Sequence, residues 1–204
     1  MKTQDTIVIL DFGSQYTQLI ARRIRENHVF SKILPYNIPA KEIKSIAPKG
    51  IILSGGPASV SQKGSPLPDK NIFKLGIPIL GICYGMQVIA KCFGGRVKPA
   101  KQREYGRTEV FIDDLQNLFY QLPGNLTCWM SHGDYVNKVP KGFKVIAHTL
   151  NNIIAGIALP QRRIYAVQFH PEVTHTSKGN QIIANFLFRI CGAYPSWTMQ
   201  SFIK

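Results

Sequence analysis

The chain has 204 residues, of which 45% are hydrophobic and 18% are charged, a composition typical of one sizeable globular domain with its own core. No apolar run is long enough to span a bilayer, and the chain enters a β-strand almost at once without a signal peptide, so we expect a cytoplasmic protein. The formal net charge of +14 is scattered along the sequence without a long basic run, so we do not expect nucleic-acid binding; a basic surface that docks an acidic partner domain fits as well.

The first half of the chain alternates strand and helix patterns. Continuous apolar runs rich in β-branched residues indicate strands buried on both faces, as in parallel sheets. Apolar residues at helical spacing indicate helices that each pack one face on the sheet. We expect strands at 6–11, 30–34, 51–53 and 77–82, and helices at 16–27, 40–46 and 86–93. This order predicts an α/β fold with a doubly wound, mostly parallel sheet flanked by helices.

Beyond residue 95 the alternation loosens. The patterns predict shorter, partly antiparallel strands, which form an additional small antiparallel portion. These strands are expected at 104–112, 126–130, 143–148 and 153–159. A further buried strand at 164–169 precedes His170-Pro-Glu172, and a helix at 179–191 closes the domain. We place the domain at 1–192 and expect the apolar tail at 193–204 to meet another surface.

Cys83 lies in the pattern Gly81-Ile-Cys-Tyr-Gly85, at the expected junction of a buried strand and a helix. In a strand-to-helix elbow, the flanking glycines permit a turn too tight for a Cβ and leave the nucleophile exposed. The positive end of the helix dipole favours the thiolate, which is the reactive form of cysteine. The pattern therefore indicates an activated thiol, although for Cys83 alone a buried core cysteine is the better interpretation.

His170 is the histidine best placed to act as the base for such a thiol. It follows a buried strand and has Glu172 two residues on, a separation at which side chains of an extended segment point to the same side. Pro171 stiffens the connection between them. A strand-end histidine is the better interpretation of His170 alone, but together with an elbow cysteine the pattern favours a Cys83–His170–Glu172 triad.

Two further segments carry candidate site residues. Ser54-Gly-Gly-Pro57 follows the third strand at its carboxyl end, where the backbone of Gly56 can contribute to an oxyanion hole; taken alone, an ordinary glycine-rich turn explains it. His132, in Ser131-His-Gly-Asp134, competes with His170 as the base. The glycine beside it indicates that backbone groups meet a ligand, so we assign His132 to substrate binding.

The remaining histidines and cysteines have simpler explanations. We expect His28 at a helix C-terminus, His148 on a strand without a partner, and His175 in a second layer of residues or at an interface. The other cysteines lack the spacing of zinc sites or small disulfide frameworks and are expected to be reduced core residues. They are Cys92, Cys128 and Cys191.

Five sequence blocks occur in the order found in class I (triad) glutamine amidotransferases, which the chain resembles over nearly all of its length. The segments Gly81–Gln87 and Gln168–Glu172 are similar to blocks of the whole superfamily. The opening Asp11-Phe-Gly-Ser-Gln15 and the extension Val173-Thr-His-Thr176 make the chain most similar to the glutaminase domains of GMP synthetases. Leu53–Pro57 and Met130–Asp134 complete the set. The resemblance implies a flavodoxin-like fold.

The same resemblance implies a role for each candidate residue. Cys83 would attack the side-chain amide of glutamine, His170 would protonate the leaving ammonia, and Glu172 would orient His170. Water would then hydrolyse the γ-glutamyl thioester. The backbone N–H groups of Gly56 and Tyr84 would hold the oxyanion. The glutamine itself would be bound by Gln87 and by the loop of Ser131, His132, Gly133 and Asp134. No metal or organic cofactor is implied for this half-reaction.

In the enzymes that the chain resembles, the ammonia serves the ATP-dependent amination of XMP to GMP. That step uses ATP and Mg in an ATP-pyrophosphatase domain, which a dimerisation domain follows, and the sequence contains neither. Ser54-Gly-Gly-Pro57 lacks the Asp and Ser of the ATP-pyrophosphatase loop. We therefore expect 193–204 to begin a linker to that domain in a truncated longer enzyme, which would form a homodimer only through the missing part.

Three alternatives remain open at this point. The chain can be a separate glutaminase subunit that acts in trans with its ATP-pyrophosphatase partner. It can be another elbow-cysteine hydrolase, such as a γ-glutamyl peptidase, and competition between glutamine and γ-glutamyl peptides separates that enzyme from an amidotransferase. The least favoured alternative is a non-enzymatic basic binding module, in which Cys83 would react with iodoacetamide no faster than Cys92.

Overall fold

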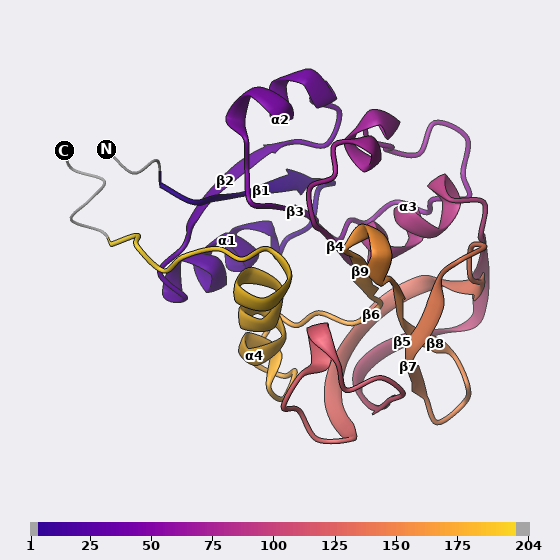
Figure 1. Ribbon diagram of the computed structural model, residues 1–204. Coiled ribbons are helices and arrows are strands. Elements are labelled where there is room, and N and C mark those ends of the chain that lie inside the picture. The colour runs from indigo at the N-terminus through magenta and orange to yellow at the C-terminus, as the bar shows by residue number, and fades with distance from the viewer. Residues whose placement is uncertain (1–3, 199–204) are drawn as a thin grey trace.

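The sheet of the protein has a parallel half and an antiparallel half (Figure 1). The structure, a computed structural model, describes residues 4–198 apart from the side chains of 101–104. Within these residues, nine strands form one sheet in the order β2-β1-β3-β4-β9-β8-β7-β5-β6. The parallel strands are β1 (Thr6–Asp11), β2 (Phe30–Pro35), β3 (Gly50–Leu53), β4 (Ile79–Ile82) and β9 (Ile164–Val167). The antiparallel strands are β5 (Arg96–Ile112), β6 (Asn125–Lys138), β7 (Lys144–Thr149) and β8 (Ile154–Leu159).

Helices cover both faces of the parallel half (Figure 1). Successive side chains of a strand point to opposite faces, so β1 contributes to two cores. Ile9 belongs to the same core as Ile24 of α1, whereas Leu10 belongs to the core that contains Ile43 of α2. The helices are α1 (Thr17–Glu26), α2 (Ala40–Ile46), α3 (Tyr84–Cys92) and α4 (Gly179–Ala184). Short 3₁₀ turns lie at Lys70–Lys74, Asn117–Phe119 and Pro160–Arg162.

The predicted fold class is confirmed, and the antiparallel strands extend the same sheet. Strand β8 pairs antiparallel with β9, so the antiparallel half begins where the parallel half ends. The hairpin of β5 and β6 is longer than the sequence predicted, because β5 begins at Arg96 and β6 continues to Lys138. The pairing of β5 with β6 shifts register between Pro99 and Glu104, which marks a bulge in the hairpin.

The segment Ser131–Asp134 is therefore part of a strand, and the prediction of a loop there is wrong. Ser131 pairs with Tyr105, and Asp134 pairs with Pro99 across the hairpin. Cross-strand pairing with β5 outweighs the local signal of Gly133, because a glycine weakens a strand without preventing its pairing. The strand fixes the direction of four candidate site residues more firmly than a loop would.

The C-terminal helix is shorter than predicted and changes its winding. After α4 the chain continues as a π-helical turn, η4 (Asn185–Ile190). The side-chain amide of Asn185 donates to the carbonyl oxygens of Leu118 and Tyr120, which ties this turn to the segment before β6. Across the described part of the chain, no helix is both long and apolar enough to cross a membrane.

The segment that follows η4 packs on the domain as far as the structure describes it. The backbone N–H of Trp197 donates to the carbonyl oxygen of His28 at 2.8 Å, and the indole is buried near Arg25. The expected linker at 193–204 lies partly outside the described residues, which end at Thr198. Its role, and the domain boundary at residue 192, stay predictions.

Candidate active site

Cys83 occupies the sharp turn between β4 and α3 that the sequence predicted. Its φ of 52° and ψ of −106° are strained for a residue with a side chain. A Cβ on Gly81 would lie 2.7 Å from the backbone of Gly85, and a Cβ on Gly85 would lie 2.3 Å from the carbonyl oxygen of Leu53. Both flanking positions therefore require glycine, as expected for a nucleophile elbow.

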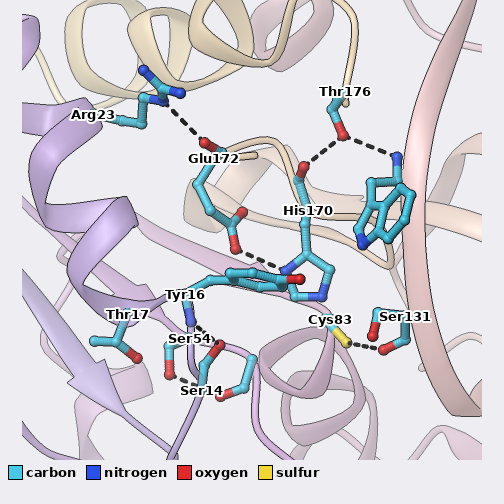
Figure 2. Close-up of polar contacts among 12 residues, drawn as sticks. Ser14, Tyr16, Thr17, Arg23, Ser54, Cys83, Ser131, His170, Glu172 and Thr176 are labelled. Atoms are coloured by element: carbon cyan, nitrogen blue, oxygen red, sulfur yellow. Dashed lines mark hydrogen bonds and ion pairs between the residues drawn. The ribbon is translucent and has the colours of Figure 1, made fainter. Parts of the chain in front are cut away.

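The sulphur of Cys83 is nearly buried, and besides the His170 imidazole it contacts two further polar groups. Its thiol donates to the carbonyl oxygen of Ser131 on β6 at 3.6 Å, as Figure 2 shows. The side-chain amide Nε2 of Gln168 donates to the sulphur at 3.7 Å. Because Cys83 is also the N-cap of α3, the positive end of the helix dipole faces it.

His170 and Glu172 form a buried pair beside this cysteine (Figure 2). His170 Nδ1 and Glu172 Oε1 are 2.7 Å apart, and the exposed fraction of Glu172 is 0%. The pair follows β9, which lies next to β4 in the sheet, so both strands end at the same edge. A Cβ on Gly55 would lie 3.1 Å from His170 Cε1 and 3.7 Å from Cys83 Cβ, so the imidazole and Cys83 flank one glycine.

The contact between His170 and Glu172 is confirmed, but its local geometry differs from the expectation. Pro171 and Glu172 lie in a turn, not in an extended segment. Two further interactions hold this turn: Thr176 Oγ1 donates to the carbonyl oxygen of His170 at 2.6 Å, and Arg23 Nε donates to that of Glu172 at 2.9 Å. Figure 2 shows both interactions and the ring of Tyr16 against His170, at 5.0 Å between ring centroids.

The electrostatic environment separates the two candidate bases. Burial disfavours the charged form of His170, but the Glu172 carboxylate and the Cys83 side chain outweigh burial and hold the pKa of His170 well above its ordinary value. Burial lowers the pKa of His132 to about 4. At neutral pH His170 therefore carries a proton that it can give to a leaving group, whereas His132 is neutral.

One cavity of about 930 Å³ brings the candidate residues together. Every predicted site residue lines it except Glu172, which lies behind His170. The lining residues that the sequence predicted are Cys83, His170, Gly56, Tyr84, Gln87, Ser131, His132, Gly133 and Asp134. The cavity is large enough for a small molecule the size of an amino acid.

The two predicted oxyanion donors, Gly56 and Tyr84, both line the cavity that contains Cys83. A Cβ on Gly56 would lie 2.5 Å from the carbonyl oxygen of Phe12, so this tightly packed backbone also requires glycine. Tyr84 is the first residue of α3, where backbone N–H groups have no partner within the helix. Its side chain turns away from the cavity centre, and its hydroxyl donates to the carbonyl oxygen of Pro66 at 2.7 Å.

The predicted glutamine contacts are linked to one another. Gln87 is buried, and its Nε2 donates to the carbonyl oxygen of Asp134 at 2.9 Å, which holds α3 against β6. The carboxylate of Asp134 accepts a short hydrogen bond from the hydroxyl of Ser59, in the loop after β3. These contacts fix the cavity wall and place one carboxylate, that of Asp134, at its surface.

Among the other histidines, one prediction is wrong. His148 has a partner: its Nδ1 is 2.9 Å from the carboxylate of Asp113, and its ring stacks on Phe111 at 5.6 Å between centroids. The missed partner lies 35 positions earlier and is brought close by the turn after β5, which local sequence patterns do not report. His175 packs on Trp129 at 5.0 Å. His28 follows the end of α1, as expected.

The other three cysteines, like Cys83, carry free thiols. Cys128 and Cys191 are buried, and Cys92 is partly buried. Burial raises the pKa of all three and brings that of Cys128 to about 12, so they are protonated at neutral pH. Among residues 4–100 and 105–198, whose side chains are described, no group of three or more His, Cys, Asp or Glu could hold a metal ion.

Three residues that contact the site were not predicted to do so: Tyr16, Thr176 and Gln168. Thr176 contacts His170 within one local turn, whereas Tyr16 meets His170 and Gln168 meets Cys83 because separate chain segments come together at the carboxyl edge of the parallel strands. The rule that open α/β sheets build sites at this edge points to the loops that carry them, but not to the individual side chains.

The fold and this geometry define a class of protein. An elbow cysteine at the edge of a doubly wound sheet, opposite a buried His–Glu pair, is an arrangement suited to acyl transfer through a cysteine nucleophile. The chain belongs to the class-I glutamine amidotransferase family, whose model matches residues 8–190.

Two curated relatives agree with this family assignment. The chain is 55% identical over 201 residues to a GMP synthase (glutamine-hydrolyzing) of Caldanaerobacter subterraneus and 55% identical over 198 residues to that of Carboxydothermus hydrogenoformans. The alignments cover 98% and 97% of the chain but 39% of each relative, so the chain spans about two fifths of their length.

Solved structures of similar proteins share the fold. A protein from Thermoplasma acidophilum, described as one subunit of a GMP synthase, superposes with a TM-score of 0.80 at 34% identity, covering 94% of this chain and 96% of that one. A glutamine amidotransferase from Thermotoga maritima superposes with a TM-score of 0.74 at 19% identity, covering 94% and 100% of the two chains. The second match supports the fold alone.

Proposed function

We propose that the chain hydrolyses L-glutamine to glutamate and ammonia, with Cys83 as nucleophile, His170 as general acid and base, and Glu172 as the group that orients His170. The observation that carries this proposal is the placement of Cys83 beside the 2.7 Å His170–Glu172 pair in one cavity. Membership of the amidotransferase family supports glutamine as the substrate.

The proposed reaction has two halves. The Cys83 thiolate attacks the side-chain amide carbon of glutamine, and the His170 imidazolium gives its proton to the leaving nitrogen, which departs as ammonia. The product of this half is a γ-glutamyl thioester on Cys83. His170, now neutral, takes a proton from water, which attacks the thioester; glutamate leaves, and the sulphur and imidazolium are restored. Glu172 stabilises the imidazolium in both halves through its contact with Nδ1.

The tetrahedral intermediates of both halves carry a negative oxygen. We assign its stabilisation to the backbone N–H groups of Gly56 and Tyr84, since both residues line the cavity with Cys83. We assign the binding of the substrate's amino acid end to residues farther along the wall, where the Asp134 carboxylate matches an α-ammonium group in charge. The other proposed contacts are Gln87, Ser131, His132 and Gly133. The proposed steps use only these side chains and backbone groups.

For the ammonia we propose a specific use, the ATP-dependent amination of XMP to GMP. The 55% identity to proteins named GMP synthase supports this, although the chain spans only 39% of their length. The acceptor reaction would take place on an ATP-pyrophosphatase domain with ATP and Mg, in the cytoplasm. That partner can act in cis, or in trans, as the name of the Thermoplasma protein indicates for that protein. Homodimer formation would depend on the partner domain.

The direct test is glutamate release from L-glutamine by the chain and by its Cys83→Ala variant. The variant should release no glutamate above background, whereas the matched variant Cys92→Ala should keep the wild-type rate because Cys92 lies on the far turn of α3. Retained activity in Cys83→Ala would remove the basis of the proposal. Competition between glutamine and γ-glutamyl peptides should show preference for free glutamine.

A further inference from the structure

Gln168 is a buried polar side chain that the proposed reaction does not use. It lies directly after β9, and its exposed fraction is 0%. Its amide Nε2 donates to the Cys83 sulphur at 3.7 Å, and its Oε1 is buried without a hydrogen-bond partner among the described residues. A buried amide oxygen without a hydrogen-bond partner lowers the free energy of unfolding.

The backbone of two neighbouring strands holds Gln168 against the cysteine. The N–H of Cys83 donates to the carbonyl oxygen of Val167 at 2.8 Å, and the N–H of Gln168 donates to that of Ala155 at 2.9 Å. These bonds continue the pairing of β4 with β9 and of β9 with β8. The backbone of Gln168 is therefore fixed beside Cys83 before any substrate binds, and from this position its side-chain amide contacts the sulphur.

The two further polar groups at the sulphur favour opposite protonation states. The carbonyl oxygen of Ser131 accepts from the thiol and repels a thiolate, since both then carry lone pairs. The Nε2 of Gln168 is a donor, and a donor bonds more strongly to a charged acceptor than to a neutral one. Of these two contacts, only that of Gln168 stabilises the thiolate, and it adds to the effects of the His170 imidazolium and the α3 dipole.

Gln168 lies between two fully buried apolar residues of the chain, Val167 and Phe169. A leucine at position 168 would fill much of the same space and leave no orphan oxygen, so packing alone does not explain the amide. We propose that Gln168 is a further catalytic residue, whose side-chain amide donates a hydrogen bond to the Cys83 sulphur and stabilises its thiolate. This inference rests on the proposed role of Cys83 as nucleophile.

The test is the pH dependence of Cys83 alkylation by iodoacetamide, followed by peptide mass spectrometry, in the wild-type chain and in Gln168→Leu. The variant should need a pH about one unit higher for half-maximal alkylation, which corresponds to about tenfold slower alkylation at any pH well below the midpoint. Cys92 in the same samples should react at an unchanged rate. Gln181 is an exposed residue of α4, so the matched variant Gln181→Leu should leave the pH dependence of Cys83 alkylation unchanged.

The other titratable groups near the sulphur are present in both the wild-type chain and Gln168→Leu. The titratable groups that line the same cavity on other segments are His170, His132, Asp134, Tyr16 and Tyr105.

An alkylation profile of folded Gln168→Leu that matches the wild type would overturn the inference. If that variant does not fold, the side-chain amide signals of Gln168 in the wild-type protein decide the matter by NMR. Their chemical shifts should change as Cys83 loses its proton and should stay constant over the same pH range in Cys83→Ala. Chemical shifts with the same pH dependence in both proteins would overturn the inference. Neither measurement needs turnover, so the inference and the proposed function can fail separately.

Discussion

Replacing Glu172 by glutamine removes one negative charge and preserves the shape of the buried pair. The amide oxygen of the new side chain can still accept from His170 Nδ1, which lies 2.7 Å from the carboxylate in the native structure, so the ring keeps its orientation. The substitution removes the attraction between the carboxylate and the imidazolium. The lowering of the His170 pKa by burial is then no longer opposed by a charge at position 172. The charged hydrogen bond is worth about 1.5–3 kcal/mol, or about one to two pKa units of His170.

This loss should appear in the kinetics as a change in kcat. The equilibrium constant for forming the thiolate–imidazolium pair from the neutral pair falls about 10- to 100-fold, because each pKa unit is a factor of ten. We expect kcat for glutamine hydrolysis to fall by about that factor while KM changes little, since Glu172 does not line the cavity. Glutamate release measured across pH checks this expectation, with Glu42→Gln, at an exposed position of α2, as the matched charge control.

The stability of the same variant supplies a second readout. A raised pKa of His170 contributes stability that is fully present below the unfolded pKa and is lost as pH rises through the folded pKa. Glu172→Gln should therefore lose more stability at mildly acidic pH than at alkaline pH, relative to the wild type. A variant with wild-type kcat and an unchanged pH profile would refute the proposed role of Glu172.

Two further predictions follow from burial and packing. Gly85→Ala should destabilise the fold by about 1–3 kcal/mol or more, because the new Cβ would lie 2.3 Å from the Leu53 carbonyl oxygen. In thermal unfolding, Gly124→Ala, with no atom within 4 Å of the new Cβ, is the matched control, and equal melting temperatures would contradict the expectation. His132→Asn should gain up to about 3 kcal/mol relative to wild type as pH falls from 6.5 to 4, because the folded pKa is lowered to about 4 and the unfolded state binds the proton first. Chemical denaturation at neutral pH and near the lowered pKa measures this gain, and parallel stability curves would contradict it.

The parallel half of the fold was predictable because its signals are local. Continuous apolar runs such as Thr6–Asp11 and Ile79–Ile82 contain their own strand pattern. The first is followed by α1, which has one buried face, and the second by α3, which is buried throughout Tyr84–Ala90. The elbow at Cys83 was predictable for the same reason, since both glycines that permit the turn lie within two residues of it.

The antiparallel half depends on long-range pairing and was predicted less well. Strand β6 runs through Gly133 because β5 supplies hydrogen-bonding partners along it, and no pattern within Ser131–Asp134 shows that pairing. The partner of His148 was missed for a related reason, since Asp113 directly follows β5 and only the pairing of β5 with β7 brings it next to His148.

Within the site, the residue types were predictable but their surroundings were not. Cys83, His170 and Glu172 follow from motifs, because acyl transfer needs a nucleophile, a base and an orienting carboxylate. Gln168 sits in one of the same motifs, yet its contact with the Cys83 sulphur depends on the register of β4 against β9. Only the assembled sheet shows that contact.

The central claim is that Cys83 carries the γ-glutamyl group during the reaction. Incubation with carbon-labelled glutamine, an acid quench and peptide mass spectrometry test it directly. The account predicts a γ-glutamyl adduct on the peptide that contains Cys83 and none on those of Cys92, Cys128 or Cys191. Glutamate release at the full rate with the label on another residue, or undiminished release by Cys83→Ala, would contradict it.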